Sequence, residues 1–205
     1  MKHFRLLVLP VLWIALASPV AAEKISLQRL SDYLNGFRTA QADFTQVNGD
    51  GSVSTGRLFI KRPGRVRFEY DPPDKSLVLA SGGTVAIFDP KSNQGPTEYP
   101  LKRTPLNLIL ARHVDLARAK MVIGHSADEK TTSVVAQDPQ HPDYGTIRLV
   151  FADSPVELRQ WVITDSAGGQ TTVVLGALEK GKKFQPSLFS ITMEAERRGS
   201  RIAER

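Results

Sequence analysis

The sequence predicts a mainly β protein of the α+β class, built as one curved antiparallel sheet of about 11 strands. Short strand-like segments recur at hairpin spacing, which requires antiparallel pairing because parallel strands need long crossover connections. A single sheet with that many strands is expected to curl and to leave a hollow side. The few helical segments are therefore expected to form a lid of two to three α-helices on the concave face of an open half-barrel.

The expected strands are bounded by turn residues, and several of them alternate between apolar and polar positions. In the segment 65–70, Val66, Phe68 and Tyr70 share one face, while charged residues share the other. One face of the sheet is therefore covered and the other is wet. The full set of expected strands is 41–47, 56–62, 65–70, 76–80, 84–88, 94–99, 120–124, 131–137, 146–151, 157–164 and 171–178.

Two helices stand out between these strands. Leu27, Leu30, Leu34 and Phe37 fall at steps of three, four and three, which gives one apolar stripe behind a possible N-cap at Ser26. The leucine-rich segment 106–112 follows a proline and forms the second helix. The stripe alone fits a lid and an ordinary core helix equally well.

The first residues predict export. Two basic residues and no acid lie within the first five, an apolar run covers 6–17, and small residues lead up to Ala22. This pattern is typical of a secretory signal peptide, residues 1–22, whose cleavage leaves one domain of residues 23–205. The apolar run is too short for a membrane span, which needs about 20 residues. We therefore expect a periplasmic protein.

Charge and cysteine content exclude several functions. Loss of Lys2 and Arg5 lowers the formal net charge from +6 to +4, too little to indicate nucleic-acid binding. The chain has no cysteine, so it has no disulfide, no thiolate nucleophile and no cysteine for lipid attachment. The C-terminal run 194–205 is unusually basic. Its arginine cluster, Arg197, Arg198, Arg201 and Arg205, is expected to be a solvated tail, with contact to anionic lipid or an acidic partner as the alternative.

The sequence carries no recognisable catalytic or metal-binding motif. It lacks the Gly-x-Ser-x-Gly and phosphate-loop patterns, and His113, His125 and His141 are too widely spaced for a short metal motif. We therefore expect a binding protein without cofactor or metal. A hydrolase whose two acidic residues are distant in sequence is the remaining enzymatic alternative.

Arg62 is the most informative charged residue. It shares strand parity with Leu58 and Ile60, so it falls on the apolar face at the end of its strand. A buried guanidinium needs several acceptors, and the carbonyl groups at helix C-termini are suitable ones. On the residues alone, the simpler interpretation is that Pro63 ends the strand and Arg62 reaches water at the rim.

At these residues the chain resembles the LolA family of outer-membrane lipoprotein carriers. The resemblance runs through nearly the whole chain behind the signal peptide. Its most specific elements are Phe-Thr-Gln at 44–46 and Lys-Arg-Pro at 61–63, in the correct spacing. The matching segments are the first helix, 42–46, 56–63, 68–70, 73–75, 81–83 and 104–110.

The resemblance implies a monomeric carrier of lipoprotein acyl chains. It implies loading by an inner-membrane ABC transporter of the LolCDE type and delivery to an outer-membrane acceptor of the LolB type where one exists. It also implies that Arg62 tethers the lid, in place of the rim interpretation. The candidate cavity residues are Leu58, Ile60, Val66, Phe68 and Tyr70 on the sheet, and Leu30, Leu34 and Leu108 on the lid. The alternative is a periplasmic sensor or carrier of other lipids on the same half-barrel.

Overall fold

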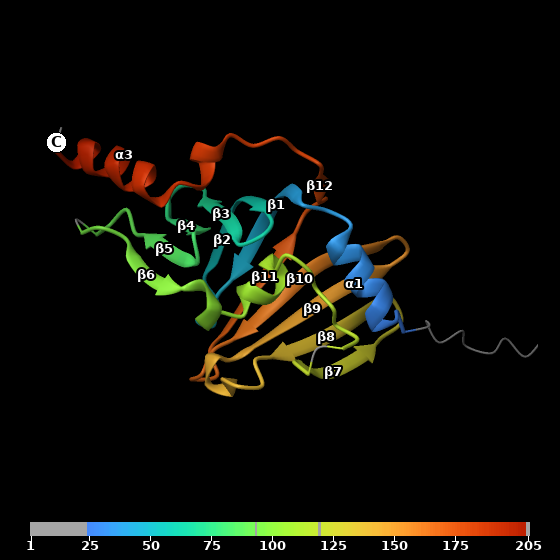
Figure 1. Cartoon of the computed structure of the whole chain (residues 1–205). Helices are drawn as coiled ribbons and strands as arrows, with labels where there is room; N and C mark the ends of the chain where they lie inside the picture. Colours follow the sequence, from blue (N-terminus) through green and yellow to red (C-terminus); the bar gives the residue numbers. More distant parts are fainter. Residues whose placement is uncertain (1–23, 93, 119, 204–205) are drawn as a thin grey trace, which may run out of the picture.

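The computed structural model describes residues 24–92, 94–118 and 120–203 and contains one antiparallel sheet of 12 strands (Figure 1). The strands are β1 (Thr39–Val47), β2 (Val53–Lys61), β3 (Arg65–Tyr70), β4 (Leu77–Ser81), β5 (Thr84–Phe88), β6 (Thr97–Pro100), β7 (Val122–Ala127), β8 (Thr131–Gln137), β9 (Thr146–Asp153), β10 (Val156–Thr164), β11 (Gln170–Leu175) and β12 (Glu179–Lys180). Their order is β6-β5-β4-β3-β2-β1-β11-β10-β9-β8-β7, and β12 pairs with β1 beside this path. The sheet is open, with β6 and β7 at its edges, so the predicted fold class is confirmed.

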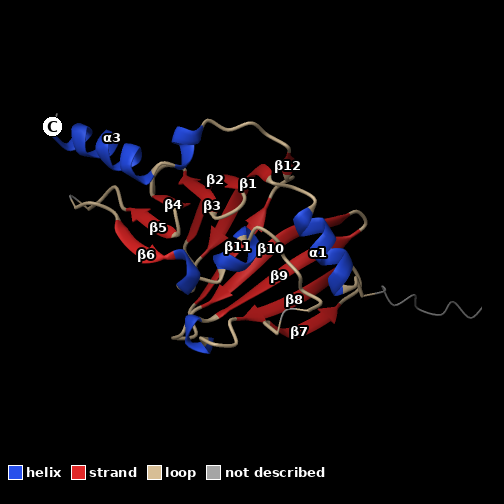
Figure 2. Ribbon diagram, in the orientation of Figure 1, coloured by secondary structure: helices blue, strands red, loops and turns tan. Residues whose placement is uncertain are grey.

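Three α-helices accompany the sheet (Figure 2). They are α1 (Leu27–Asn35), α2 (Leu106–Leu110) and α3 (Ile191–Ala203), with short 3₁₀ turns at Leu101–Arg103, Pro142–Tyr144 and Pro186–Phe189. Ser26 caps α1 as expected, since its hydroxyl oxygen accepts from the backbone N–H of Arg29 at 3.2 Å. Within the described residues, no helix combines the length and the apolar character that crossing a membrane would require.

The sheet curves strongly around its apolar side. Phe68 on β3 and Trp161 on β10 are separated in the sheet by β2, β1 and β11. Their rings nevertheless meet edge to face, with centroids 6.2 Å apart. Phe44 on β1 lies against Phe68 in the same way at 5.4 Å. These contacts across the hollow are possible only if the two halves of the sheet fold toward each other, as in a half-barrel.

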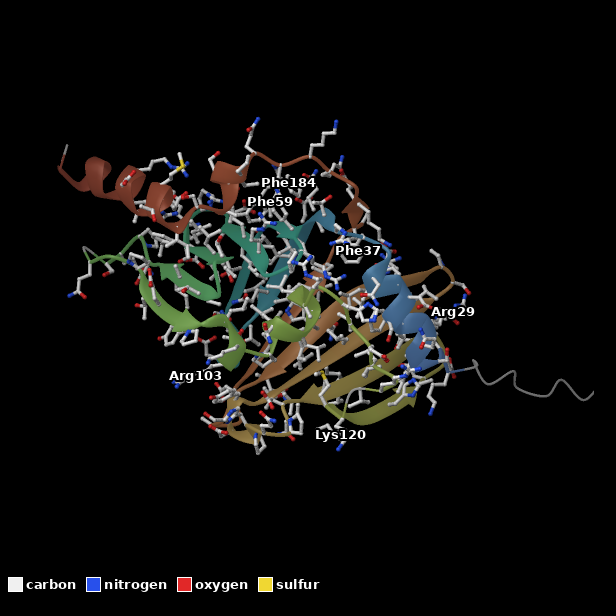
Figure 3. All side chains as sticks on the ribbon, in the orientation of Figure 1. Arg29, Phe37, Phe59, Arg103, Lys120 and Phe184 are labelled. Carbon is white, nitrogen blue, oxygen red and sulfur yellow. The ribbon has the colours of Figure 1, made fainter. Side chains whose placement is uncertain are left out.

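The third helix lies outside the lid, so the lid has two of the predicted two to three helices. α1 and α2 lie on the concave side, whereas α3 and the turn before it cover the opposite, convex face of β2 to β5. Phe59 and Leu79 point outward there and are buried by Phe184 and Phe189. Figure 3 shows Phe59 and Phe184 together beneath the C-terminal segment, with ring centroids 5.7 Å apart. This half of the sheet is therefore covered on both faces.

The C-terminal stretch is a docked helix and not a solvated tail. Glu194 on α3 and Arg67 on β3 are both almost fully buried and form an ion pair at 3.1 Å. Arg67 also contacts Glu69 at 2.6 Å and donates to the Leu188 carbonyl at 3.2 Å. The expectation was drawn from the arginines alone and overlooked Glu194, whose carboxylate neutralises Arg67.

Candidate functional site

The Arg62 side chain joins the ends of both lid helices. It is 5% exposed, at the end of β2, so it does not reach water at the rim. Its Nε and Nη2 atoms donate to the Ala111 carbonyl, just after α2, at 3.0 and 2.7 Å. Its Nη1 donates to the carbonyl of Leu34 on α1 and, at 3.4 Å, to that of Phe37. These acceptors lie at helix C-termini, where carbonyls lack helical partners and carry partial negative charge.

The backbone of the β2–β3 hairpin strengthens the same junction. The Arg62 N–H donates to the Arg38 carbonyl at 2.7 Å, and the Gly64 N–H donates to the Leu110 carbonyl at 2.8 Å. Gly64 has a φ of +69°, a conformation in which glycine carries no steric penalty. Burial, and then the charge of Arg38, lower the pKa of Arg62. An arginine nevertheless stays protonated at neutral pH.

Two polar side chains of α1 bind the segment 111–118 that follows α2. Asn35 donates to the Val114 carbonyl at 2.7 Å and accepts from the Val114 N–H at 3.0 Å. Ser31 accepts from the Leu116 N–H at 2.8 Å and donates to a carbonyl within α1. Helix α1 and this segment, which we call the strap, are therefore joined by specific hydrogen bonds as well as by apolar packing.

The other end of α1 is attached to the sheet. The Ile25 N–H donates to the Thr132 hydroxyl oxygen on β8 at 3.1 Å, and Thr132 is buried. The His125 ring on β7 contacts the Ile25 carbonyl through Nε2 at 2.9 Å. The lid helix is thus held at its start by β7 and β8 and at its end by Arg62.

The predicted cavity residues lie together beneath this lid. Leu30, Leu34, Leu58, Ile60, Val66 and Phe68 are buried members of one apolar cluster, and Tyr70 and Leu108 pack against it. The Tyr70 hydroxyl donates to Gln46 Oε1 at 2.7 Å, and burial, followed by the charge of Asp74, raises the pKa of Tyr70 to about 12. The cluster forms the interface between the lid and the sheet, and its role in binding cargo stays a prediction.

Two hollows differ in their chemistry. A cavity of about 140 Å³ opens beside α2, where Leu108, Met121 and Ile147 contribute apolar walls. A larger hollow of about 940 Å³ lies on the convex face, where charged residues such as Asp43 and Arg57 line it. Their side chains pair at 3.7 Å. Of these two hollows, the smaller one lies on the concave side and has the more apolar wall, as a hydrocarbon chain requires.

The geometry shows what this site can do chemically. In the described part of the chain, no group of three or more histidine, aspartate or glutamate residues is placed to hold a metal ion. The concave interior is lined by aliphatic and aromatic side chains and roofed by two helices held through a few hydrogen bonds. Such an interior suits hydrocarbon, and displacing the roof requires no strand pairing to break.

Sequence reasoning missed three residues of this site. Ser31 and Asn35 are polar residues within the first helix whose partners lie about 80 positions later. Trp161, on β10, is the largest fully buried side chain on the concave side. A bulge between Leu158 and Gln160 shifts the alternation of this strand, so simple parity places Trp161 on the wrong face.

Comparisons with known proteins agree with this architecture. Residues 35–192 match the family described as outer membrane lipoprotein carrier protein LolA. The outer-membrane lipoprotein carrier protein of Coxiella burnetii is 30% identical over 185 residues, covering 85% of this chain and 86% of its own. That of Azotobacter vinelandii is 28% identical over 199 residues, covering 92% and 94%. A crystal structure of a DUF1329 family protein from Desulfovibrio piger has a TM-score of 0.50 at 10% identity, covering 82% and 95%, and shares the fold alone.

Proposed function

Because the chain belongs to the LolA family of outer membrane lipoprotein carrier proteins, we propose that it is a periplasmic chaperone for lipoproteins. It takes up their acyl chains at the inner membrane and delivers them to the outer membrane. The observation that supports this proposal most directly is Arg62, which joins both lid helices over the apolar concave face of the sheet. A carrier of other lipids is not favoured, since the curated relatives are lipoprotein carriers by name.

The chemistry of the cargo explains the need for a lid. Each buried methylene group is worth about 0.8 kcal/mol, so two or three acyl chains cost tens of kcal/mol to expose to water. A carrier must cover this surface and still release it. The closed lid covers the hollow when no cargo is bound, and cargo enters by displacing the lid. The hydrogen bonds lost on opening then oppose cargo binding by a few kcal/mol and keep release possible.

The energy for loading has to come from outside this chain. We assign the donor role to an inner-membrane ABC transporter of the LolCDE type and the acceptor role to an outer-membrane lipoprotein of the LolB type where one exists. Residues 1–22 are assigned as the cleaved signal peptide that brings the chain to the periplasm, and they lie outside the described residues. The carrier acts as a monomer.

Arg62→Leu tests the proposal. The variant loses the donors that hold both helices and leaves their terminal carbonyls unpaired, which weakens lid closure by about 2–4 kcal/mol. We expect Arg62→Leu to load lipoprotein and to pass it to acceptor membranes several-fold more slowly than the wild type. Transfer of a labelled lipoprotein to vesicles carrying the acceptor measures this directly.

Two further variants make the test specific. Arg112→Leu removes an exposed arginine just beyond α2 and should transfer normally. Arg62→Lys keeps the charge without the planar fork of donors and should fall between the two. Normal transfer by Arg62→Leu would contradict the tether, and failure of the wild type to bind any lipoprotein would contradict the carrier function.

A further inference from the structure

Trp161 carries a buried hydrogen-bond donor that lacks an acceptor. Its side chain is 1% exposed and belongs to the apolar cluster under the lid. Its neighbours on the adjoining strands are Leu149 and Val173, and the ring of Phe68 closes on it from across the hollow. Within the described part of the chain, no acceptor lies within hydrogen-bond reach of the indole Nε1. The closed protein therefore holds this N–H at a cost, because a buried donor without a partner is destabilising.

The position of Trp161 makes it accessible in one state only. It lies on β10 and belongs to the same apolar cluster as Leu34 of α1 and Leu110 of α2. Movement of the lid away from the sheet therefore opens the cluster that encloses it. A ligand that replaces the lid can reach the indole N–H, whereas solvent cannot reach it while the lid is closed.

The surroundings define which chemical group can serve as the acceptor. The side chains around Trp161 are apolar, so a charged group would pay a large desolvation penalty there. A hydroxyl or amine would bring donors of its own that need partners. A carbonyl oxygen attached directly to hydrocarbon accepts one hydrogen bond and adds no donor. The ester carbonyl at the head of an acyl chain has this chemistry.

We propose that the indole N–H of Trp161 binds an acyl carbonyl of the cargo once the lid has opened. This inference rests on the proposed carrier function and adds to it a polar contact that selects acylated lipid over plain hydrocarbon. The donor is unpaired in the closed state and paired in the loaded state. The contact thus favours loading without adding any bond that opening of the lid must break.

The sequence offers a clean spectroscopic test. It contains two tryptophans, Trp13 and Trp161, so a protein that begins at residue 23 has Trp161 alone and gives a single indole N–H resonance. The probes are a short-chain diacylglycerol, which has ester carbonyls, and the matching dialkylglycerol ether, which has none. We expect the resonance to move downfield, as for a newly formed hydrogen bond, with the ester probe and not with the ether probe.

An isosteric variant supplies the matching affinity test. Trp161→benzothienylalanine replaces the N–H by sulfur and keeps the shape of the ring. It should bind the ester probe roughly tenfold more weakly than the wild type and the ether probe equally well. In the empty state it should be at least as stable, because the unpaired donor has been removed.

Each outcome decides a different point. Equal affinities of both proteins for both probes, together with an indole resonance that responds alike to ester and ether, would overturn the carbonyl contact and leave the carrier function intact. Failure of the wild type to bind either probe would overturn both. Should the isosteric variant not fold, the resonance of the wild-type protein still decides between these results.

Discussion

Two buried arginines on neighbouring strands, Arg62 and Arg67, differ in the kind of acceptor that they contact, and this difference affects how easily each contact can break. Arg67 is neutralised by the carboxylates of Glu69 and Glu194, and losing them would leave a buried charge. Among the described residues, the acceptors of the Arg62 side chain are carbonyl groups and an amide oxygen. Carbonyl dipoles hold a guanidinium less strongly than carboxylates do. The convex contact is thus suited to permanence, and the concave contact to opening.

Removal of Glu194 should destabilise the whole domain. Arg67 keeps Glu69 and the Leu188 carbonyl, so we expect Glu194→Ala to lower the free energy of unfolding by about 2–3 kcal/mol, less than for a fully orphaned charge. Urea denaturation followed by circular dichroism measures it. The double variant Arg67→Met with Glu194→Leu should recover most of the loss, because apolar packing replaces the pair. A single variant as stable as the wild type would contradict the structural role of this pair.

The same carboxylate predicts how stability depends on pH. Burial raises the pKa of Glu194, but the hydrogen bond from Arg198 and the charges of Arg67 and Arg197 outweigh burial and hold the pKa below its ordinary value. A depressed pKa means that ionised Glu194 stabilises the native state above the ordinary carboxylate range, near 4.3, and that this contribution is lost as the pH falls through the folded value. Melting temperatures between neutral pH and pH 3 should therefore fall less steeply for Glu194→Gln than for the wild type. Identical slopes would show that Glu194 contributes nothing to the acid sensitivity.

At the scale of elements, the lid consists of more than its two helices. The strap, residues 111–118, is bonded to α1 through Ser31 and Asn35, and Arg62 joins α1 to the first residue of the strap. Arg62 Nη2 also donates to the side-chain oxygen of Asn35 at 3.4 Å, so Asn35 links Arg62 to the strap. Helix α1 and the strap are therefore expected to move together when the hollow opens.

Asn35→Ala should separate these two parts of the lid. The variant leaves the N–H and carbonyl of Val114 unpaired, which costs the strap about 1–3 kcal/mol of local stability. Hydrogen exchange should accelerate in residues 111–118 while the strands keep their protection. Gln28→Ala, on the exposed side of the same helix, is the matched control and should leave the strap unchanged. Unaltered exchange in Asn35→Ala would mean that apolar packing alone holds the strap.

For the molecule as a whole, the sequence was sufficient to predict the antiparallel sheet and the burial of its concave face. Alternation in β3 placed Val66 and Phe68 on the covered side, as the structure has them. The sequence did not predict that the convex face of β4 would also be buried. Leu77 and Leu79 alternate with other apolar residues, and a strand that is apolar at every position does not indicate which of its faces is buried. Helix C-terminal carbonyls were named as suitable acceptors for Arg62, but the sequence did not tell which carbonyls would lie beside it.

The curvature of the whole sheet buries Trp161, whose intrinsic fluorescence can report whether the lid is open or closed. A protein beginning at residue 23 has Trp161 as its sole tryptophan, and this side chain is buried in the apolar cluster that includes Leu34 of α1 and Leu110 of α2. The empty wild type should show blue-shifted emission and resist quenching by acrylamide, because the indole is enclosed by apolar side chains. Arg62→Leu should shift the emission to the red and increase quenching, since a weakened lid exposes the hollow more often. Arg112→Leu should match the wild type. If Arg62→Leu kept the wild-type spectrum and quenching, the lid would stay closed without Arg62. The hypothesis that the Arg62 hydrogen bonds control lid opening would then be wrong.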